Sequence, residues 1–253
     1  MKKVIISHLV LFIVASTTVF SQKITANCSQ LSGIEKVVCL AEKLKSMVSQ
    51  EQLALLQLEY SKGDAVRWSN FPQAFARPGR VGLSFGALSA EQLAAAKALM
   101  SAVLSHDKTD EGYDELEGVL VADHFFGEKT GNTKTFGSGY YVIVFLGKPS
   151  TTQLWELMFG GHHFAFANTY NGGKIIGATP SFRGVEPMEA INANGRIYQP
   201  LEQERQAFEE VIGGLSDSEK QAASLPLLST MCCWDRVRII CFRQPNRDFV
   251  LVT

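Results

Sequence analysis

Two adjacent histidines are the residues of this sequence with the clearest capacity for chemistry. His162 and His163 follow directly after Gly160 and Gly161. A neutral imidazole is a common metal ligand, and it accepts a proton readily near neutral pH. We therefore take the pair as candidate catalytic residues and as candidate ligands of a divalent metal.

The predicted backbone limits what the two histidines can do together. Residues 162–169 have the composition of a strand, and neighbouring side chains of a regular strand point to opposite faces. His162 and His163 would then not reach the same metal ion. A bulge at Gly160 and Gly161 would re-aim one ring, because glycine adopts the backbone angles that a bulge needs. The alternative is structural, with one histidine bonded in the core and the other at the surface.

The sequence offers several residues for the third ligand that a metal site needs. His124 stands four residues before Glu128, a spacing that places both side chains on one side of a helix. This makes His124 a candidate metal ligand, and a solvated helix end is the alternative. Glu156 and Glu186 are weaker candidates for the same role.

Three residues are candidates for binding a flat ligand such as a sugar ring. They are Trp68, Asn70 and Trp155. An indole ring stacks well on a flat partner, but burial in the core is the alternative for both tryptophans. The sequence contains no P-loop and no glycine fingerprint of a dinucleotide-binding fold, so these common ligand classes have no motif here.

The elements that must position these residues change type along the chain. Apolar residues recur at helical spacing over residues 31–44, and Ser49 with Gln52 has the pattern of a capping box. Residues 140–146 are β-branched and aromatic, as in a buried strand. The order of helices, then strands, then helices predicts an α+β fold, with helices flanking a mostly antiparallel sheet built from residues 139–178.

The N-terminus has the pattern of an export signal. Lys2 and Lys3 precede an apolar run over residues 4–19, and the residues before Ser21 fit cleavage after that serine. The run is shorter than the ~20 residues that span a bilayer, which favours a cleaved signal over an anchor. We expect residues 1–21 to be removed, and a periplasmic or secreted mature protein without a membrane span.

Charge and cysteine content narrow the class of protein further. The chain has 24 basic and 25 acidic residues and a net charge of -1, which supplies no basic surface for nucleic acid. Export exposes the chain to an oxidising compartment, where Cys28 and Cys39 are candidates for a disulfide. Cys232, Cys233 and Cys241 lack the paired spacing of a zinc site.

Several short motifs resemble those of one bacterial family. They are WSNFP from Trp68, RVGL from Arg80, the single Trp155, FGGHH from Phe159 and TP from Thr179. In this order the motifs resemble the bacterial domain-of-unknown-function family 3500, over roughly residues 35–228. The histidine pair and the tryptophan before it are the most specific part. The resemblance implies no assigned activity.

The resemblance also implies a longer chain. Family members continue past Thr253 with a second, weaker copy of the first half that has its own histidine pair. The codons of residues 231–234, read one base earlier, give Val-Leu-Leu-Gly, which is similar to what members carry at this point. We expect residues 22–228 to be an incomplete family domain and residues 229–253 to be a frameshifted tail. A genuine short protein with a strand at residues 236–242 is the alternative.

These observations predict an exported α+β protein whose candidate function is an enzyme with a site centred on the histidine pair. A divalent metal is the candidate cofactor. One alternative is a non-catalytic ligand-binding or structural protein, in which the histidines only hold the sheet. Another is a truncated product without function.

Overall fold

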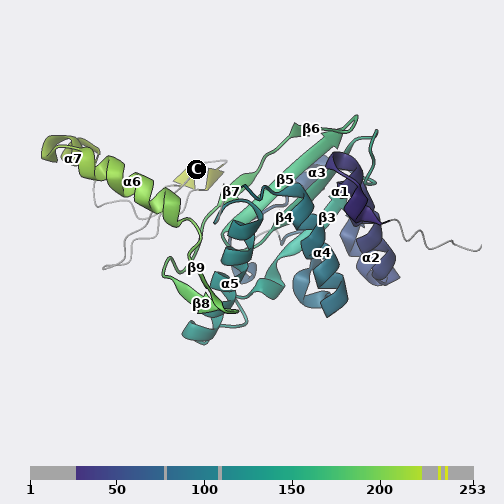
Figure 1. Cartoon of the computed structure of the whole chain (residues 1–253), viewed down its shortest axis with the longest axis horizontal. Coiled ribbons are helices and arrows are strands. Elements are labelled where there is room, and N and C mark those ends of the chain that lie inside the picture. Colours follow the sequence, from purple (N-terminus) through teal and green to yellow (C-terminus); the bar gives the residue numbers. More distant parts are fainter. Residues whose placement is uncertain (1–26, 77–78, 108–109, 224–232, 235–236, 239–253) are drawn as a thin grey trace, which may run out of the picture.

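The β-branched and aromatic segments in the middle of the chain pair into one sheet (Figure 1). The computed structural model describes residues 27–76, 79–107, 110–223, 233–234 and 237–238. Within these residues, seven strands form the sheet in the order β1-β3-β4-β5-β6, with β2 also on β3 and β7 also on β5. These strands are β1 Gln57–Leu58, β2 Leu83–Ser84, β3 Val142–Leu146, β4 Trp155–Gly160, β5 Phe164–Asn171, β6 Lys174–Gly177 and β7 Ser181–Arg183.

Strand pairing in this sheet is antiparallel except between β1 and β3. The long pairs are β3 with β4, which aligns Val142 with Gly160, and β4 with β5, which aligns Gly160 with Ala165. The prediction of an α+β fold with a mostly antiparallel sheet from residues 139–178 is confirmed.

Helices lie before, between and after the strands in the chain. They are α1 Gly33–Met47, α2 Gln50–Leu56, α3 Lys62–Ala65, α4 Ala90–Val103, α5 Tyr113–Thr130, α6 Glu202–Gly214 and α7 Asp217–Ala223. Ser49 caps α2 together with Gln52, so the predicted capping box is confirmed. Short 3-10 turns lie at Cys28–Gln30, Gln73–Phe75, Phe85–Ala87 and Ser138–Tyr140.

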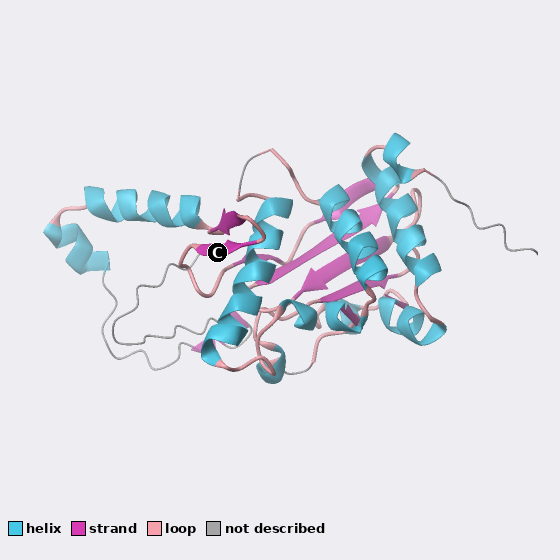
Figure 2. Cartoon of the chain, turned by 60° about the horizontal axis from the view of Figure 1, so that its bottom comes forward, coloured by secondary structure: helices cyan, strands magenta, loops and turns pink. Residues whose placement is uncertain are grey.

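One face of the sheet packs against α1, α4 and α5, which cross it in front of the strands (Figure 2). Burial of apolar side chains between these two layers supplies the main driving force of this fold. The core side chains come from both layers: Leu40, Leu44, Leu99, Met100, Leu116, Leu120, Ile143, Phe145, Leu157, Phe159 and Phe166.

The opposite face of the sheet has a thinner cover. Val144, Leu146 and Met158 point to this side and pack with Val81 and the half-buried Ala65. The segment between α3 and β2 therefore lies against the back of the sheet. It carries the Trp68 motif that the sequence analysis singled out.

The remaining described strands form two separate two-stranded sheets. One joins β8 Ile191–Ala193 to β9 Arg196–Tyr198, and it contacts α5. The other joins β10 Cys233–Trp234 to β11 Val237–Arg238. No helix within the described residues has the length and apolarity to cross a membrane. The predicted signal at residues 1–21 lies outside the described residues.

Candidate metal centre

The two histidines form the connection between β4 and β5. The amide of Gly161 donates to the carbonyl of Phe164 at 2.8 Å, so the chain reverses across His162 and His163. His163 has a φ of +64°, in the left-handed region. The predicted strand over residues 162–169 is wrong at its start, because β5 begins at Phe164.

The alternation of a strand therefore does not separate the two imidazole rings. Their centroids lie 3.9 Å apart. The bulge that would have re-aimed one ring is absent at Gly160, which keeps regular pairing with Val142 and Ala165. A tight turn re-aims the side chains instead.

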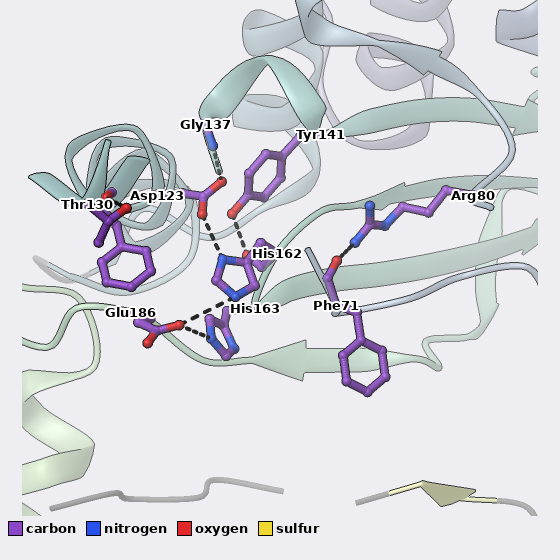
Figure 3. A network of polar contacts seen from close by, with 10 residues as sticks. Phe71, Arg80, Asp123, Thr130, Gly137, Tyr141, His162, His163 and Glu186 are labelled. Carbon is purple, nitrogen blue, oxygen red and sulfur yellow. Dashed lines mark hydrogen bonds and ion pairs between the residues drawn. The ribbon is translucent and has the colours of Figure 1, made fainter. Parts of the chain in front are cut away.

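A tyrosine ring requires the glycine before this turn. A Cβ atom on Gly161 would lie 2.2 Å from the ring of Tyr141, well inside van der Waals contact. Tyr141 is fully buried, and its hydroxyl donates to the carbonyl of His162. The glycine thus lets an aromatic ring lie against the hairpin and bind the backbone of the turn (Figure 3).

The backbone of His163 is held from the other side by the Trp68 segment. Its amide donates to the carbonyl of Asn70 at 2.9 Å. A left-handed conformation costs a residue with a Cβ roughly 1–2 kcal/mol, so this contact offsets part of the cost. Gly184 completes the surroundings, because a Cβ at that position would lie 3.3 Å from Nδ1 of His163.

Glu186 brings a carboxylate to both rings. Its Oε2 lies 3.7 Å from Nε2 of His162 and 3.5 Å from Nε2 of His163. The potential ligand atoms of the three residues all lie within 4.8 Å of one another. Two atoms bound at 2.0–2.1 Å to a tetrahedral zinc lie roughly 3.3–3.4 Å apart, so the observed spacing is close to that of a metal centre.

Asp123 of α5 sets the orientation of His162. Its Oδ1 lies 2.7 Å from Nδ1 of the imidazole, and its Oδ2 accepts the amide of Gly137 at 2.9 Å. A carboxylate acts as acceptor here, so Nδ1 carries the proton and Nε2 presents its lone pair to Glu186. Such carboxylate–histidine pairs are common behind metal ions, where they fix the ring and raise its basicity (Figure 3).

The surroundings of His162 favour its neutral form. Burial lowers the pKa of this imidazole, while the hydrogen bond to Asp123 acts in the opposite direction. The ring of Phe136 lies over it with centroids 5.1 Å apart and covers one side. A neutral imidazole whose Nε2 carries no proton is the form that binds a metal ion.

His124 lies outside this cluster. Its side chain is 62% exposed, and its partner is Glu128 at 3.5 Å, as expected for a solvated helix end. Glu156 is also elsewhere, because it is buried in β4 and accepts the hydroxyl of Thr169 at 2.7 Å. Of the proposed third ligands, the structure brings only Glu186 to the histidine pair.

The structure separates the two tryptophans. Trp155 is fully buried, donates Nε1–H to the carbonyl of Ser150 at 2.8 Å and stacks on Tyr170, which supports the packing alternative. Trp68 is 38% exposed, so ligand contact by this ring stays a prediction. Asn70 contributes its backbone carbonyl to the turn, and a role for its side chain likewise stays a prediction.

Asp123 is a functional candidate that no sequence motif indicated. The sequence does contain an indication of its role. Asp123 falls on the same face of the helix as the buried Leu116, Leu120 and Gly127. A carboxylate on an apolar stripe is rarely buried without a partner. That partner, His162, lies in the β4–β5 turn 39 residues later, which helical spacing alone does not identify.

A family model described as "Protein of unknown function (DUF3500)" matches residues 30–248. The chain belongs to the DUF3500 family. This match confirms the resemblance found in the sequence motifs. Comparison with curated proteins and with solved structures found no match.

The DUF3500 match extends beyond residue 228 into the segment that we predicted to be frameshifted. Residues 229–253 lie outside the described residues, apart from the short hairpin of β10 and β11. The frameshift therefore stays a prediction, and so does the domain division at residue 228.

Proposed function

We propose that this DUF3500 protein is a metal-dependent enzyme whose divalent ion is bound by Nε2 of His162, Nε2 of His163 and Oε2 of Glu186. The observation that carries the proposal is the approach of both Nε2 atoms to one carboxylate oxygen, at 3.7 and 3.5 Å. The carboxylate of Asp123 behind His162 adds the outer hydrogen bond that metal-binding histidines commonly have.

The donor set favours catalysis over a purely structural role for the ion. Two imidazoles and one carboxylate leave a position open on a tetrahedral ion, whereas structural zinc sites use all four positions for protein ligands. A bound divalent ion supplies Lewis-acid chemistry at such an open position. The same donors also suit non-haem iron, so the proposal extends to divalent transition metals as a class.

Asp123, Phe136 and Glu186 have different roles at this centre. Asp123 holds the proton on Nδ1 of His162 and keeps Nε2 directed toward Glu186. The ring of Phe136 shields His162 from water. Glu186 is the more exposed member, with 37% of its side chain accessible, so a substrate would approach from its side.

A disulfide supports an exported location for this protein. The structure links Cys28 to Cys39 through a disulfide, with the Cα atoms 5.8 Å apart. Disulfides persist in oxidising compartments, so this pair agrees with a signal at residues 1–21. We propose a periplasmic or secreted protein on this ground.

Metal content of the purified full-length chain tests the proposal. We expect one divalent ion per chain by elemental analysis, and its loss in the His162→Ala, His163→Ala and Glu186→Gln variants. Asp123→Asn should bind the ion about 10–100-fold more weakly, because it removes the charge behind His162. His124→Ala is the matched control, since this exposed histidine lies outside the cluster and its loss should leave the metal content unchanged.

The outcome that contradicts the proposal is a folded wild-type chain that binds neither zinc, cobalt, manganese nor ferrous iron. Retention of the ion by all three ligand variants would do the same. Circular dichroism of each variant must show intact folding. A metal-free, folded protein would support the alternative in which the histidines only hold the hairpin against the sheet.

A further inference from the structure

Arg80 is a charged residue that the metal centre does not use directly. Its Nε donates to the carbonyl of Ser69 at 2.8 Å, its Nη1 to the side-chain oxygen of Gln73 at 2.8 Å, and its Nη2 to the carbonyl of Phe71. It forms no ion pair with a carboxylate in the described part of the chain. All three partners belong to one short segment, residues 69–73.

The backbone carbonyl of Asn70, which lies within this segment, accepts a hydrogen bond from the histidine turn. Asn70 lies between Ser69 and Phe71, whose carbonyls both accept from the same guanidinium. Its own carbonyl accepts the amide of His163 at 2.9 Å. Two fixed neighbours leave the Asn70 carbonyl little freedom to rotate away.

We propose that Arg80 is a positioning residue of the metal centre: it fixes residues 69–73 so that the Asn70 carbonyl holds His163 in its left-handed conformation, with the ring directed at Glu186. Figure 3 shows Arg80 and Phe71 beside the histidine pair, on the side away from Asp123. Asp123 thus orients the first histidine and Arg80 orients the second. This inference rests on the proposed function.

The chemistry of the contact explains why an arginine stands here. A guanidinium has five N–H donors in a rigid plane and reaches several acceptors at fixed angles. An ammonium group is a single point and does not reproduce this geometry. Burial lowers the pKa of Arg80 to about 10, with the nearby Tyr141 and Asp123 acting in the opposite direction, so the group remains a cation at neutral pH.

Cobalt(II) titration of the full-length chain tests the role in metal binding. We expect Arg80→Gln to bind cobalt about 10–100-fold more weakly than wild type and to change the visible absorption bands of the ion, because one imidazole is less well oriented. Arg80→Lys should recover only part of the affinity. A merely structural role would lower stability without moving the spectrum of the remaining complex.

Arg67→Gln is the matched control. Arg67 lies two residues before this segment and donates to the carbonyl of Gly79 at 2.9 Å, but it does not bond residues 69–73. We expect its cobalt affinity to stay within twofold of wild type. Equal losses in Arg67→Gln and Arg80→Gln would overturn the proposal, because they would indicate general loosening of the segment.

Hydrogen exchange of the His163 amide, measured by NMR on the metal-free chain, tests the same contact without metal. We expect this amide to be protected in wild type and in Arg67→Gln, and to exchange at least tenfold faster in Arg80→Gln. Unchanged exchange would overturn the role of Arg80 even if metal binds. Conversely, a wild-type chain that binds no metal but shows this protection would contradict the proposed function and leave the Arg80 contact intact.

Discussion

At the scale of single residues, two of the three proposed ligands are held by a second polar group of the fold. His162 bonds Asp123, and the amide of His163 bonds a loop carbonyl. Glu186 follows three residues after Arg183, whose Nε lies 3.3 Å from Glu115. The guanidinium of Arg183 also stacks over the ring of Phe164, 4.1 Å from its centroid, beside the histidine turn.

Glu115 makes the free energy of unfolding depend on pH. Burial raises the pKa of its carboxyl from 4.5 to about 7, and attraction by Arg183 only partly opposes that shift. Below pH 4.5 both the folded and the unfolded chain hold the proton. Between pH 4.5 and 7 the unfolded chain releases it first, so the free energy of unfolding falls as pH rises, by about 3 kcal/mol in total.

We predict that the free energy of unfolding of Glu115→Gln, compared with that of wild type, is higher at pH 8 than at pH 5. The reason is that glutamine stays neutral at both pH values. Urea denaturation at the two pH values measures this difference. Glu117→Gln, on the same helix and 3.1 Å from Lys97, controls for the loss of an ordinary ion pair. The same free-energy difference from wild type at both pH values would contradict the shifted pKa of Glu115.

At the scale of elements, the β4–β5 hairpin is the unit that builds the site. Its strands pair regularly up to Gly160 and Ala165, so the turn has room for only His162 and His163 between Gly161 and Phe164. A two-residue turn fixes where its side chains point far more tightly than a long loop does. Helix α5 then brings Asp123 to the same place from the helical layer.

Replacing the glycine of this hairpin should damage fold and site together. We predict that Gly161→Ala costs about 1–3 kcal/mol or more of unfolding free energy, because the new Cβ would collide with the buried Tyr141 ring. Weaker metal binding should accompany the loss, since Tyr141 bonds the carbonyl of His162. Urea denaturation and cobalt titration measure the two effects.

A second hairpin glycine provides the comparison. Gly172, between β5 and β6, has a positive φ, unlike Gly161, and a Cβ there would meet nothing within 4 Å. Gly172→Ala should cost about 1 kcal/mol from backbone strain alone and leave cobalt affinity unchanged. If both glycine variants lose the same free energy and both bind cobalt normally, contact with Tyr141 is not what requires Gly161.

At the scale of the whole molecule, helices and sheet share one main core. A disulfide links the first helix to the segment before it. Cys28 lies in the 3-10 turn ahead of α1, and Cys39 lies within α1. The disulfide closes a loop of short sequence separation, 11 residues. Because α1 packs on the sheet, the crosslink anchors the start of the described fold.

We predict that the Cys28→Ser, Cys39→Ser double variant loses about 2–3 kcal/mol of unfolding free energy, since the unfolded chain regains the freedom of the opened loop. A reducing agent should lower the free energy of unfolding of wild type to the same level and leave that of the double variant unchanged.

Mass spectrometry of protein exported by a bacterial host should find an N-terminus at Gln22. Free thiols at both cysteines in that exported protein would contradict the prediction.

Local sequence patterns predicted much of the fold. The period of the apolar residues predicted α1, and a capping box predicted the start of α2. The run of β-branched and aromatic residues predicted β3, and the sheet lies where it was expected. These features depend on neighbouring residues, so short windows of sequence contain the information.

The site depended on contacts between segments far apart in the chain. The sequence by itself determined that His162 and His163 were the candidates, but strand periodicity wrongly set them apart. Only the tertiary structure decided that they share a turn, and that Asp123 and Glu186 meet them there. The physical reason is that pairing of β4 with β5 sets where the strand ends, and packing of α5 on the sheet sets which carboxylate is buried beside it.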